Sequence, residues 1–489
     1  MSTRIAIVGG GIAGLAAAYF LRDHAPDQAP GQATITVLES SPRLGGKLAV
    51  SEVAGVGVDS GAEALLARRP EGIDLIAELG LADQLRQPGT TSARLWTRGQ
   101  FRSLPRRQFM GVPGDLDELE RTAIISPAGL ARARAETLPD EPRPAANSGD
   151  VSVARYVGDR LGSEVVDRLV EPLLGGVYAG RPDQLSFDAT LPVLAKASRD
   201  HRSLVDTVRN IAGVSSAQPE PDLPAPPVFT TLAAGLGTLP LVLAKASRAT
   251  FRTMATVREL ARTPTGWRLT IGPTIAPEHL EVDAVILALP ARPASRLIAR
   301  VDTATAAALA GIEYASMAII TLAYPASAFP VPLSGSGYLV PAVDGRPVKA
   351  ATFSTIKWPH LATDVHIVRC SVGRIGEEAV LQRDDADLVA LAAADFAAAT
   401  GATGAPVDSR VTRWGGGLPQ YTVGHLDRVA AIRSGIAALG GLVVCGAAYD
   451  GIGIPACIAS ARMAADQVTA WLRENESHGR TAGATPQSP

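Results

Sequence analysis

The chain has 489 residues, of which 46% are hydrophobic and 19% are charged, and its formal net charge is −2. This length predicts two or three domains, and the near-neutral charge argues against a nucleic-acid-binding protein. No apolar run is long enough to cross a membrane, although a peripheral membrane contact stays open. The three scattered cysteines, Cys370, Cys445 and Cys457, favour neither a disulfide framework nor a zinc site. We therefore expect a cytoplasmic protein without a bound metal.

The N-terminal segment predicts a strand, a glycine turn and the start of a helix. Apolar residues 5–8 form the strand, and a G-x-G-x-x-G turn follows it directly. In such a turn the first glycine permits the bend, the second lets the backbone approach a pyrophosphate, and the third packs the helix on the strand. The N–H groups that begin the helix attract phosphate. We expect a dinucleotide to bind at Gly9, Gly10, Gly11, Ile12, Ala13 and Gly14.

A second β-rich run, residues 34–38, ends at Glu39. A carboxylate in this place accepts hydrogen bonds from ribose hydroxyls, and this much fits NAD as well as FAD. The residues that follow favour FAD, because they resemble the E-x5-GG element of amine-oxidase-like flavoproteins, in which the turn passes close to the FAD pyrophosphate. The predicted contacts of this turn are Glu39, Ser40, Arg43, Gly46 and Lys47.

Two further segments complete the predicted FAD site. In the same superfamily, a segment like Ser60, Gly61, Ala62 and Glu63 runs beneath the isoalloxazine ring. Near the other end of the chain, residues 442–458 predict a second strand–turn–helix unit. Its N–H groups would meet the ribityl chain and pyrimidine oxygen and stabilise the negative charge of reduced flavin. The predicted contacts of this second turn are Gly446, Asp450, Ile452, Gly453 and Ile454.

These segments predict an α/β fold with a split, Rossmann-like FAD-binding domain, a mixed α/β substrate domain and a helical insertion. The expected FAD-binding domain comprises residues 1–89, 228–290 and 411–472. The expected insertion, 90–227, is mainly helical. The expected substrate domain is 291–410, and the polar tail, 475–489, is expected to be disordered.

Four more stretches, in order along the chain, carry a specific resemblance. They are EPLLGGVYAG at 171–180 with QLS at 184–186, GSGYLVP at 335–341, LPQY at 418–421 after Trp414, and GIGIPACI at 451–458. Together with the FAD turns they resemble the oxygen-dependent protoporphyrinogen/coproporphyrinogen III oxidases of haem synthesis. The resemblance covers nearly the whole chain. It implies an FAD oxidase that converts a porphyrinogen to a porphyrin, with O2 as acceptor and H2O2 as product.

The resemblance also implies further site residues. It adds Val257 and Trp414 to the FAD contacts. A flat macrocycle needs walls without bulk, and the expected substrate residues are mostly small: Gly175, Gly176, Ala179, Gly337 and Leu339. Arg69 is a candidate partner for a substrate propionate. The chemistry requires a substrate held against the flavin and no nucleophile, so no side chain is expected to be catalytic.

Several alternatives stay open. Ser336 is polar where plant and animal members carry an aromatic residue, which favours coproporphyrinogen III over protoporphyrinogen IX. An amine oxidase could recruit Lys349, and a carotenoid desaturase has the same fold. An alternative from a different functional class is a flavin-binding structural or membrane-associated protein without turnover. A haem-pathway enzyme such as a ferrochelatase is an expected partner that would take the product.

Overall fold

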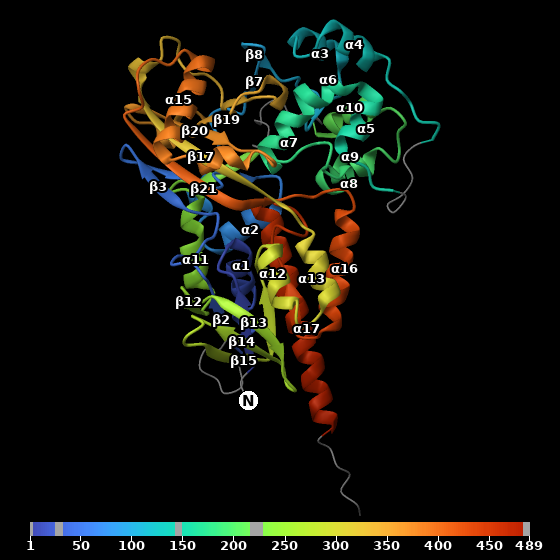
Figure 1. Ribbon diagram of the computed structural model, residues 1–489, viewed down its shortest axis with the longest axis vertical. Helices are drawn as coiled ribbons and strands as arrows, with labels where there is room; N and C mark the ends of the chain where they lie inside the picture. Colours follow the sequence, from blue (N-terminus) through green and yellow to red (C-terminus); the bar gives the residue numbers. More distant parts are fainter. Residues whose placement is uncertain (1–2, 25–32, 142–148, 216–227, 483–489) are drawn as a thin grey trace, which may run out of the picture.

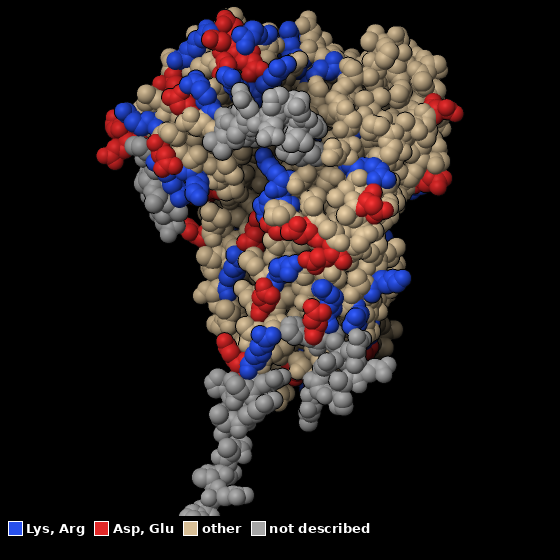
Figure 2. Space-filling model, turned by 180° about the vertical axis from the view of Figure 1, so that it is seen from behind, with Lys and Arg blue, Asp and Glu red and all other residues tan. Residues whose placement is uncertain are grey.

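The computed structural model describes residues 3–24, 33–141, 149–215 and 228–482, and Figure 1 shows a lower lobe that carries two upper lobes. Within these ranges no helix is both long and apolar enough to cross a membrane. On the face seen in Figure 2, basic and acidic side chains are interspersed, without a large patch of one sign. The expected α/β fold is confirmed.

The lower lobe is built on a parallel sheet whose strands come from three separate parts of the chain. Its order is β12 (Thr250–Arg252), β2 (Thr34–Leu38), β1 (Arg4–Val8), β16 (Ala284–Leu287) and β22 (Leu442–Val444). The central strands are apolar along their length because helices cover both faces of the sheet.

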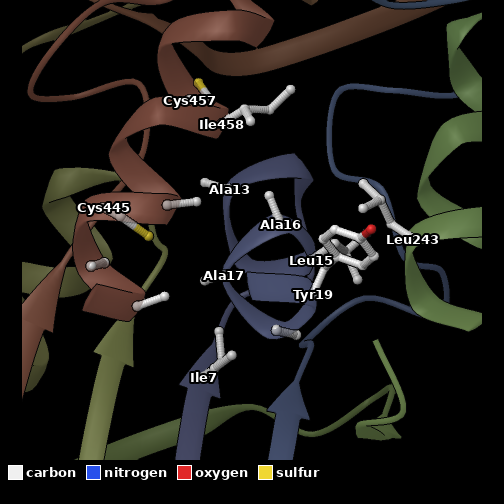
Figure 3. Close-up of a cluster of buried hydrophobic side chains, with 14 of the residues drawn as sticks. Ile7, Ala13, Leu15, Ala16, Ala17, Tyr19, Leu243, Cys445, Cys457 and Ile458 are labelled. Atoms are coloured by element: carbon white, nitrogen blue, oxygen red, sulfur yellow. The ribbon is translucent and has the colours of Figure 1, made fainter. Parts of the chain in front are cut away.

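Alternate residues of the central strands enter two hydrophobic cores. Ile5 and Ile7 of β1 pack with α1 (Ile12–Phe20), α11 (Leu239–Ala246) and the first part of α17 (Ile454–Ala482), as Figure 3 shows around Ile7, Leu15 and Cys457. Ala6 and Val8 face α12 (Ala291–Ile298), α13 (Thr303–Ala310) and α16 (His425–Ala438). A separate antiparallel sheet, β13 (Val257–Arg262), β14 (Trp267–Ile271) and β15 (Glu278–Val282), packs in the second core.

One upper lobe is a seven-stranded sheet with α15 (Asp385–Thr400) packed on one face. Its strands, in spatial order, are β21 (Asp408–Pro419), β17 (Tyr314–Pro325), β20 (Val365–Val372), β19 (Val348–Phe353), β18 (Gly337–Leu339), β7 (Ala93–Thr97) and β8 (Gln100–Ser103). The remaining shorter elements are β3 (Val50–Val53), β4 (Val56–Asp59), β5 (Leu65–Leu66), α2 (Pro70–Glu78), β6 (Leu85–Arg86), β11 (Phe229–Leu232) and α14 (Ser354–Lys357).

The other upper lobe is mainly helical, with its own core. Its elements are β9 (Gln108–Phe109), β10 (Val112–Pro113), α3 (Leu116–Thr122), α4 (Pro127–Arg134), α5 (Val153–Leu161), α6 (Ser163–Val165), α7 (Glu171–Tyr178), α8 (Phe187–Thr190), α9 (Pro192–Ala197) and α10 (Leu204–Ser215). A π-helical turn, Val166–Val170, joins α6 to α7. It lies just before Pro172, which has no N–H with which to bond the carbonyl four residues earlier.

The elements depart from the expected residue ranges at four places. Strands β7 and β8, from the expected helical insertion, join the seven-stranded sheet. Helices α12 and α13, from the expected substrate domain, share a hydrophobic core with the parallel sheet. Strand β21, which begins three residues before the expected FAD-binding segment at 411, belongs to the seven-stranded sheet.

The fourth departure is the tail, where residues 475–482 continue helix α17 instead of being disordered. Each added residue of an established helix gains a backbone hydrogen bond without a new nucleation cost, so polar composition alone did not predict the end. Residues 483–489 lie outside the described part of the chain.

Helices α13 and α16 approach closely at Gly435, where an added Cβ would lie 1.8 Å from Thr305 Oγ1. Alanine in place of a helical glycine normally stabilises by about 1 kcal/mol. Here we expect Gly435→Ala to destabilise by roughly 1–3 kcal/mol because of the overlap. Gly158→Ala in α5 is the matched control, since its Cβ would meet Val166 at an ordinary 3.6 Å. Equal thermal midpoints for the two variants would contradict this packing.

Candidate active site

The three spaced glycines of the first turn differ in what surrounds them. A Cβ on Gly9 would lie 2.4 Å from the Ala288 carbonyl oxygen, and one on Gly14 would lie 1.9 Å from the Gly9 carbonyl oxygen. A Cβ on Gly11 would meet nothing within 4 Å. The outer glycines are therefore required by packing, while Gly11 faces open space in front of helix α1.

A second glycine turn closes on the first. Gly45 N–H donates to the Gly10 carbonyl at 2.8 Å, and a Cβ on Gly46 would lie 3.2 Å from Gly11 Cα. The Arg43 guanidinium braces this turn by donating to the Gly46 carbonyl at 2.6 Å and, at 3.3 Å each, to the carbonyls of two neighbouring residues, Leu44 and Leu48.

The start of helix α1 is suited to an anion. No side chain caps it, and its first turn, which includes Ile12 and Ala13, carries no acidic residue. The partial positive charge of the helix end is therefore directed at the open space beside Gly11. The glycine cradle and the free helix end fit a pyrophosphate.

Glu39 ends strand β2 beside this cradle. Its Oε2 accepts from Gly10 N–H at 2.7 Å and its Oε1 accepts from Ser41 N–H at 2.7 Å, with the Ser40 hydroxyl at 3.4 Å. Carboxylate oxygens have further lone pairs, which a ribose hydroxyl would use. The Glu39 carbonyl accepts from Ala255 N–H at 2.8 Å, so the chain enters strand β13 at Val257 close to the same acid. The residues fit a nucleoside in the predicted place.

Beyond the second turn, three chain segments meet at Gly61. A Cβ on Gly61 would lie 1.9 Å from the Lys47 carbonyl oxygen and 3.1 Å from Trp414 Cζ2. Ala62 N–H donates to the same Lys47 carbonyl at 3.3 Å, and Trp414 Nε1 donates to the Ser60 carbonyl at 3.0 Å. The structure thus brings together predicted contacts that lie more than 350 residues apart in the sequence, at 60 and 414.

Lys47 lies at the same junction as Gly61. Lys47 is exposed, yet desolvation by the surrounding protein lowers the pKa of its ammonium group. Among the described residues Lys47 has no ion-pair partner, so its charge is available to a bound group.

The Glu63 carboxylate is paired with two cations of the protein itself. It accepts from Lys357 Nζ at 2.6 Å and from Arg369 Nη1, and Arg369 Nη2 donates to the Gly61 carbonyl at 2.5 Å. Burial raises the pKa of Glu63, but the two cations outweigh it and hold the pKa at about 2. The segment Ser60–Glu63 can therefore offer a cofactor its backbone, while direct contact from the Glu63 carboxylate stays a prediction.

The C-terminal turn lies against the N-terminal one. Gly446 has a φ of +120°, and its Cβ would be 3.7 Å from the Ala13 Cβ. Gly453 is exposed at the turn, and Ile454 begins α17 one residue later. Asp450 is held by an ion pair with Arg433 at 2.5 Å. The two nucleotide turns therefore meet beside α1, where one cofactor would contact both.

The expected substrate residues gather on α7 and β18. A Cβ on Gly176 would lie 3.3 Å from Leu339 Cδ2, so helix and strand are in contact. Ala179 ends α7 in the left-handed region with a φ of +49°. Gly175 and Gly337 have packing reasons to be glycine, because their Cβ atoms would meet Glu171 Oε1 at 3.0 Å and the Ala351 carbonyl at 2.1 Å, respectively. We call α7 and β18 the wall.

The wall is joined to the C-terminal turn through the LPQY segment. Gln420 Nε2 donates to the Tyr178 carbonyl of α7 at 2.8 Å. The Tyr421 hydroxyl donates to the Ala447 carbonyl at 2.6 Å and accepts from Gly451 N–H at 2.8 Å. The LPQY stretch contributed to the resemblance, but sequence reasoning did not identify Gln420 and Tyr421 as the link between the two sites.

Arg69 lies at the start of α2, at the edge of the same region. Its guanidinium pairs with Glu71 at 2.7 Å, and its side chain is 45% exposed. Two positions after the helix begins, a Cβ on Gly72 would lie 3.3 Å from Pro455, which follows the C-terminal turn. The structure therefore brings the first turn of α2 close to the start of α17, and the role of Arg69 toward a propionate stays a prediction.

Lys349 is held inside the protein by its own contacts. It is 3% exposed, a β-bulge interrupts strand pairing at its position, and its Nζ donates to the Gly373 carbonyl at 2.7 Å. Burial and the neighbouring Arg374 lower the pKa of Lys349 to about 7. This environment gives no support to Lys349 as the flavin-side lysine of an amine oxidase.

We expect Gly11→Ala and Gly14→Ala to fail in different ways. Gly11→Ala should leave the thermal stability of the apoprotein unchanged and abolish FAD retention, because its Cβ occupies the open space beside α1. Gly14→Ala should destabilise the apoprotein because its Cβ meets the Gly9 carbonyl oxygen at 1.9 Å. The measurements are the flavin-to-protein absorbance ratio and the thermal midpoint. Full flavin content in Gly11→Ala would contradict the assignment.

Lys349 predicts a pH-dependent stability. The unfolded chain holds this proton up to about pH 10.4, whereas the folded chain releases it near pH 7. The group therefore penalises folding below pH 7, and wild-type stability should gain on the order of a few kcal/mol from it between pH 7 and 10. Lys349→Met should lose this gain in urea-denaturation series at the two pH values, while Lys245→Met on exposed α11 should retain it. An identical pH dependence in both variants would contradict the burial of a titrating Lys349.

Comparison with known proteins agrees with this geometry. Residues 12–469 match the family of flavin-containing amine oxidoreductases. A coproporphyrinogen III oxidase of Mycobacterium leprae (strain TN) is 38% identical, covering 95% of this chain and 98% of that protein. The coproporphyrinogen III oxidase of Mycobacterium tuberculosis (strain ATCC 25618 / H37Rv) is 39% identical, with coverages of 94% and 96%.

A solved structure described as a protoporphyrinogen oxidase, from Exiguobacterium sp. 255-15, superposes with a TM-score of 0.82 at 30% identity, covering 95% of this chain and 98% of its own. The predicted FAD cofactor and the predicted family resemblance are both confirmed. The chain belongs to the flavin-containing amine oxidoreductases, in the branch that contains these coproporphyrinogen III oxidases.

Proposed function

We propose that this chain is an FAD-dependent oxidase that converts coproporphyrinogen III to coproporphyrin III, with O2 as acceptor and H2O2 as product, in haem biosynthesis. One observation carries the proposal. Gln420 and Tyr421 join the α7–β18 wall to the C-terminal flavin turn by direct hydrogen bonds. A substrate lying against the wall would thereby be held in a fixed place relative to the flavin.

The chain's own residues act by binding and positioning. The glycine cradle and the N-terminal end of α1 would hold the pyrophosphate, Glu39 would hold the ribose, and the backbone of Ser60–Glu63 would support the ring. When bound, the flavin supplies the two-electron acceptor for each oxidation. A porphyrinogen is wide and flat, and Gly176 and Leu339 give the wall a surface with little bulk. Fixed placement of both partners accelerates the reaction because it removes the entropic cost of bringing them together.

The names of the relatives favour coproporphyrinogen III as substrate. Several curated relatives carry that name, including one from Bacillus subtilis (strain 168) at 29% identity. Ser336 supports the same choice. Its backbone is held at the start of β18, since its N–H donates to the Ser92 carbonyl at 2.9 Å and its carbonyl accepts from Phe353 N–H at 3.0 Å.

Protoporphyrinogen IX is the second candidate substrate. Two similar proteins favour this substrate. The Exiguobacterium structure is described as a protoporphyrinogen oxidase, and a chloroplastic protoporphyrinogen oxidase of Arabidopsis thaliana is 26% identical over 96% of this chain. The proposal also includes a cytoplasmic location and a product-accepting partner such as a ferrochelatase. The three cysteines, all free and buried, are consistent with a reducing compartment.

The test is anaerobic mixing of the purified flavoprotein with each porphyrinogen in turn. We expect coproporphyrinogen III to bleach the flavin absorbance faster than protoporphyrinogen IX, and porphyrin fluorescence to develop on admission of air. Faster bleaching by protoporphyrinogen IX would move the substrate to the second candidate. A flavin that neither compound bleaches, but that dithionite does, would contradict the proposed function.

A further inference from the structure

A buried charge cluster joins the upper sheet lobe to the segment Ser60–Glu63. Glu63 meets Lys357 at the end of α14 and Arg369 in β20, and the three side chains are 14%, 16% and 8% exposed, respectively. We call these three residues the clamp. Arg369 also donates to the Gly61 carbonyl at 2.5 Å, so the clamp holds both the backbone and the side chain of this segment.

The clamp is shielded from bulk solvent. A small cavity beside it, with a volume of about 20 Å³, is lined in part by Asp59, Glu63, Ser354, Trp358 and Arg369. The buried Ser354 hydroxyl, Trp358 Nε1 and Arg369 Nε have no hydrogen-bond partner in the described protein. A cavity of this size and polarity accommodates a single water molecule, which would satisfy some of these donors. Charges in such a place are screened little by salt.

The clamp carries two cations and one carboxylate, and Asp59, whose pKa burial raises to about 6, adds a second carboxylate beside the same cavity. The clamp charges are one hydrogen bond away from Gly61, whose backbone also abuts Trp414 and the Lys47 carbonyl. Reduction adds negative charge to a flavin ring, and an unscreened positive charge nearby stabilises the reduced form. A change in the charge of the clamp would change the reduction potential in a direction that is set by its sign.

We propose that the clamp of Glu63, Lys357 and Arg369 sets the reduction potential of the bound flavin, in addition to holding Ser60–Glu63 in place. These are positioning residues that act through the backbone of Gly61. The inference rests on the FAD-binding part of the proposed function and not on the identity of the substrate.

The experiment measures the flavin reduction potential of the full-length holoprotein by anaerobic equilibration with a reference dye. Glu63→Gln should favour reduced flavin about tenfold, a rise of about 30 mV for a two-electron couple. Lys357→Met should shift the potential by a similar amount in the opposite direction. Lys357→Arg keeps the charge and should restore the wild-type value. Measurement at pH 8 keeps the neighbouring Asp59 ionised, because burial raises the pKa of Asp59 only to about 6.

Glu281→Gln is the control, because it removes one charge of the exposed pair that Glu281 forms with Arg268 at 2.7 Å on the small antiparallel sheet. A purely structural clamp would shift both Glu63→Gln and Lys357→Met in the same direction, and that result would overturn the proposal. Shifts no larger than that of Glu281→Gln would also overturn it. If Glu63→Gln does not retain flavin, the comparison of Lys357→Met with Lys357→Arg decides alone.

The dye reduces the flavin without any porphyrinogen, so the two proposals fail separately. Opposite shifts in a protein that oxidises no porphyrinogen would keep this inference and remove the substrate. Porphyrinogen turnover with an unchanged potential in the variants would keep the function and remove the inference.

Discussion

The site depends on the contact between two backbone turns that have no side chains between them. A Cβ on Gly46 would come within 3.2 Å of Gly11 Cα, and Gly45 bonds to Gly10. This contact fixes the second turn over the start of α1. The position of that turn determines where Lys47 lies and where Gly61 packs against it. A side chain at Gly11 would fill the open space that a pyrophosphate requires, whereas one at Gly10 or Gly45 would collide with neighbouring protein atoms. The glycines therefore determine both the path of the chain and the room for the cofactor.

The rest of the molecule brings distant segments to this junction. The parallel sheet gathers strands from three parts of the chain, so the N-terminal and C-terminal turns meet at Ala13 and Gly446. The seven-stranded sheet is connected to the segment Ser60–Glu63 through Trp414 and the clamp. The helical lobe reaches the C-terminal turn through Gln420 and Tyr421. Each lobe thus has a polar connection to the cofactor site, and movement of one lobe would change the geometry of that site.

The sequence predicted the parts of this arrangement that depend on local geometry. The glycine turn, the ribose acid and the fold class follow from spacing and from strand and helix patterns. The placement of β7 and β8 in the distant sheet depends on long-range pairing, which no local pattern records. Polar composition likewise did not reveal that α17 continues to Ala482.

The clamp was missed for a related reason, although a signal was present. Arg369 stands in the apolar strand VHIVRCSV, and a buried arginine requires an anionic partner. That partner could not be chosen from the sequence, because Glu63 lies 306 positions away. The sequence also did not show whether a given glycine is required by packing or by a ligand. Gly175 and Gly337 were predicted as ligand contacts, and at Gly337 the Ala351 carbonyl at 2.1 Å is already a packing reason for glycine.

The most direct measurement is a crystal structure of the holoprotein with coproporphyrin III bound. The account predicts the FAD pyrophosphate beside Gly11 and the macrocycle between the flavin ring and the wall, in contact with Gly176 and Leu339. A macrocycle bound elsewhere, with the wall closed by protein side chains, would contradict the account.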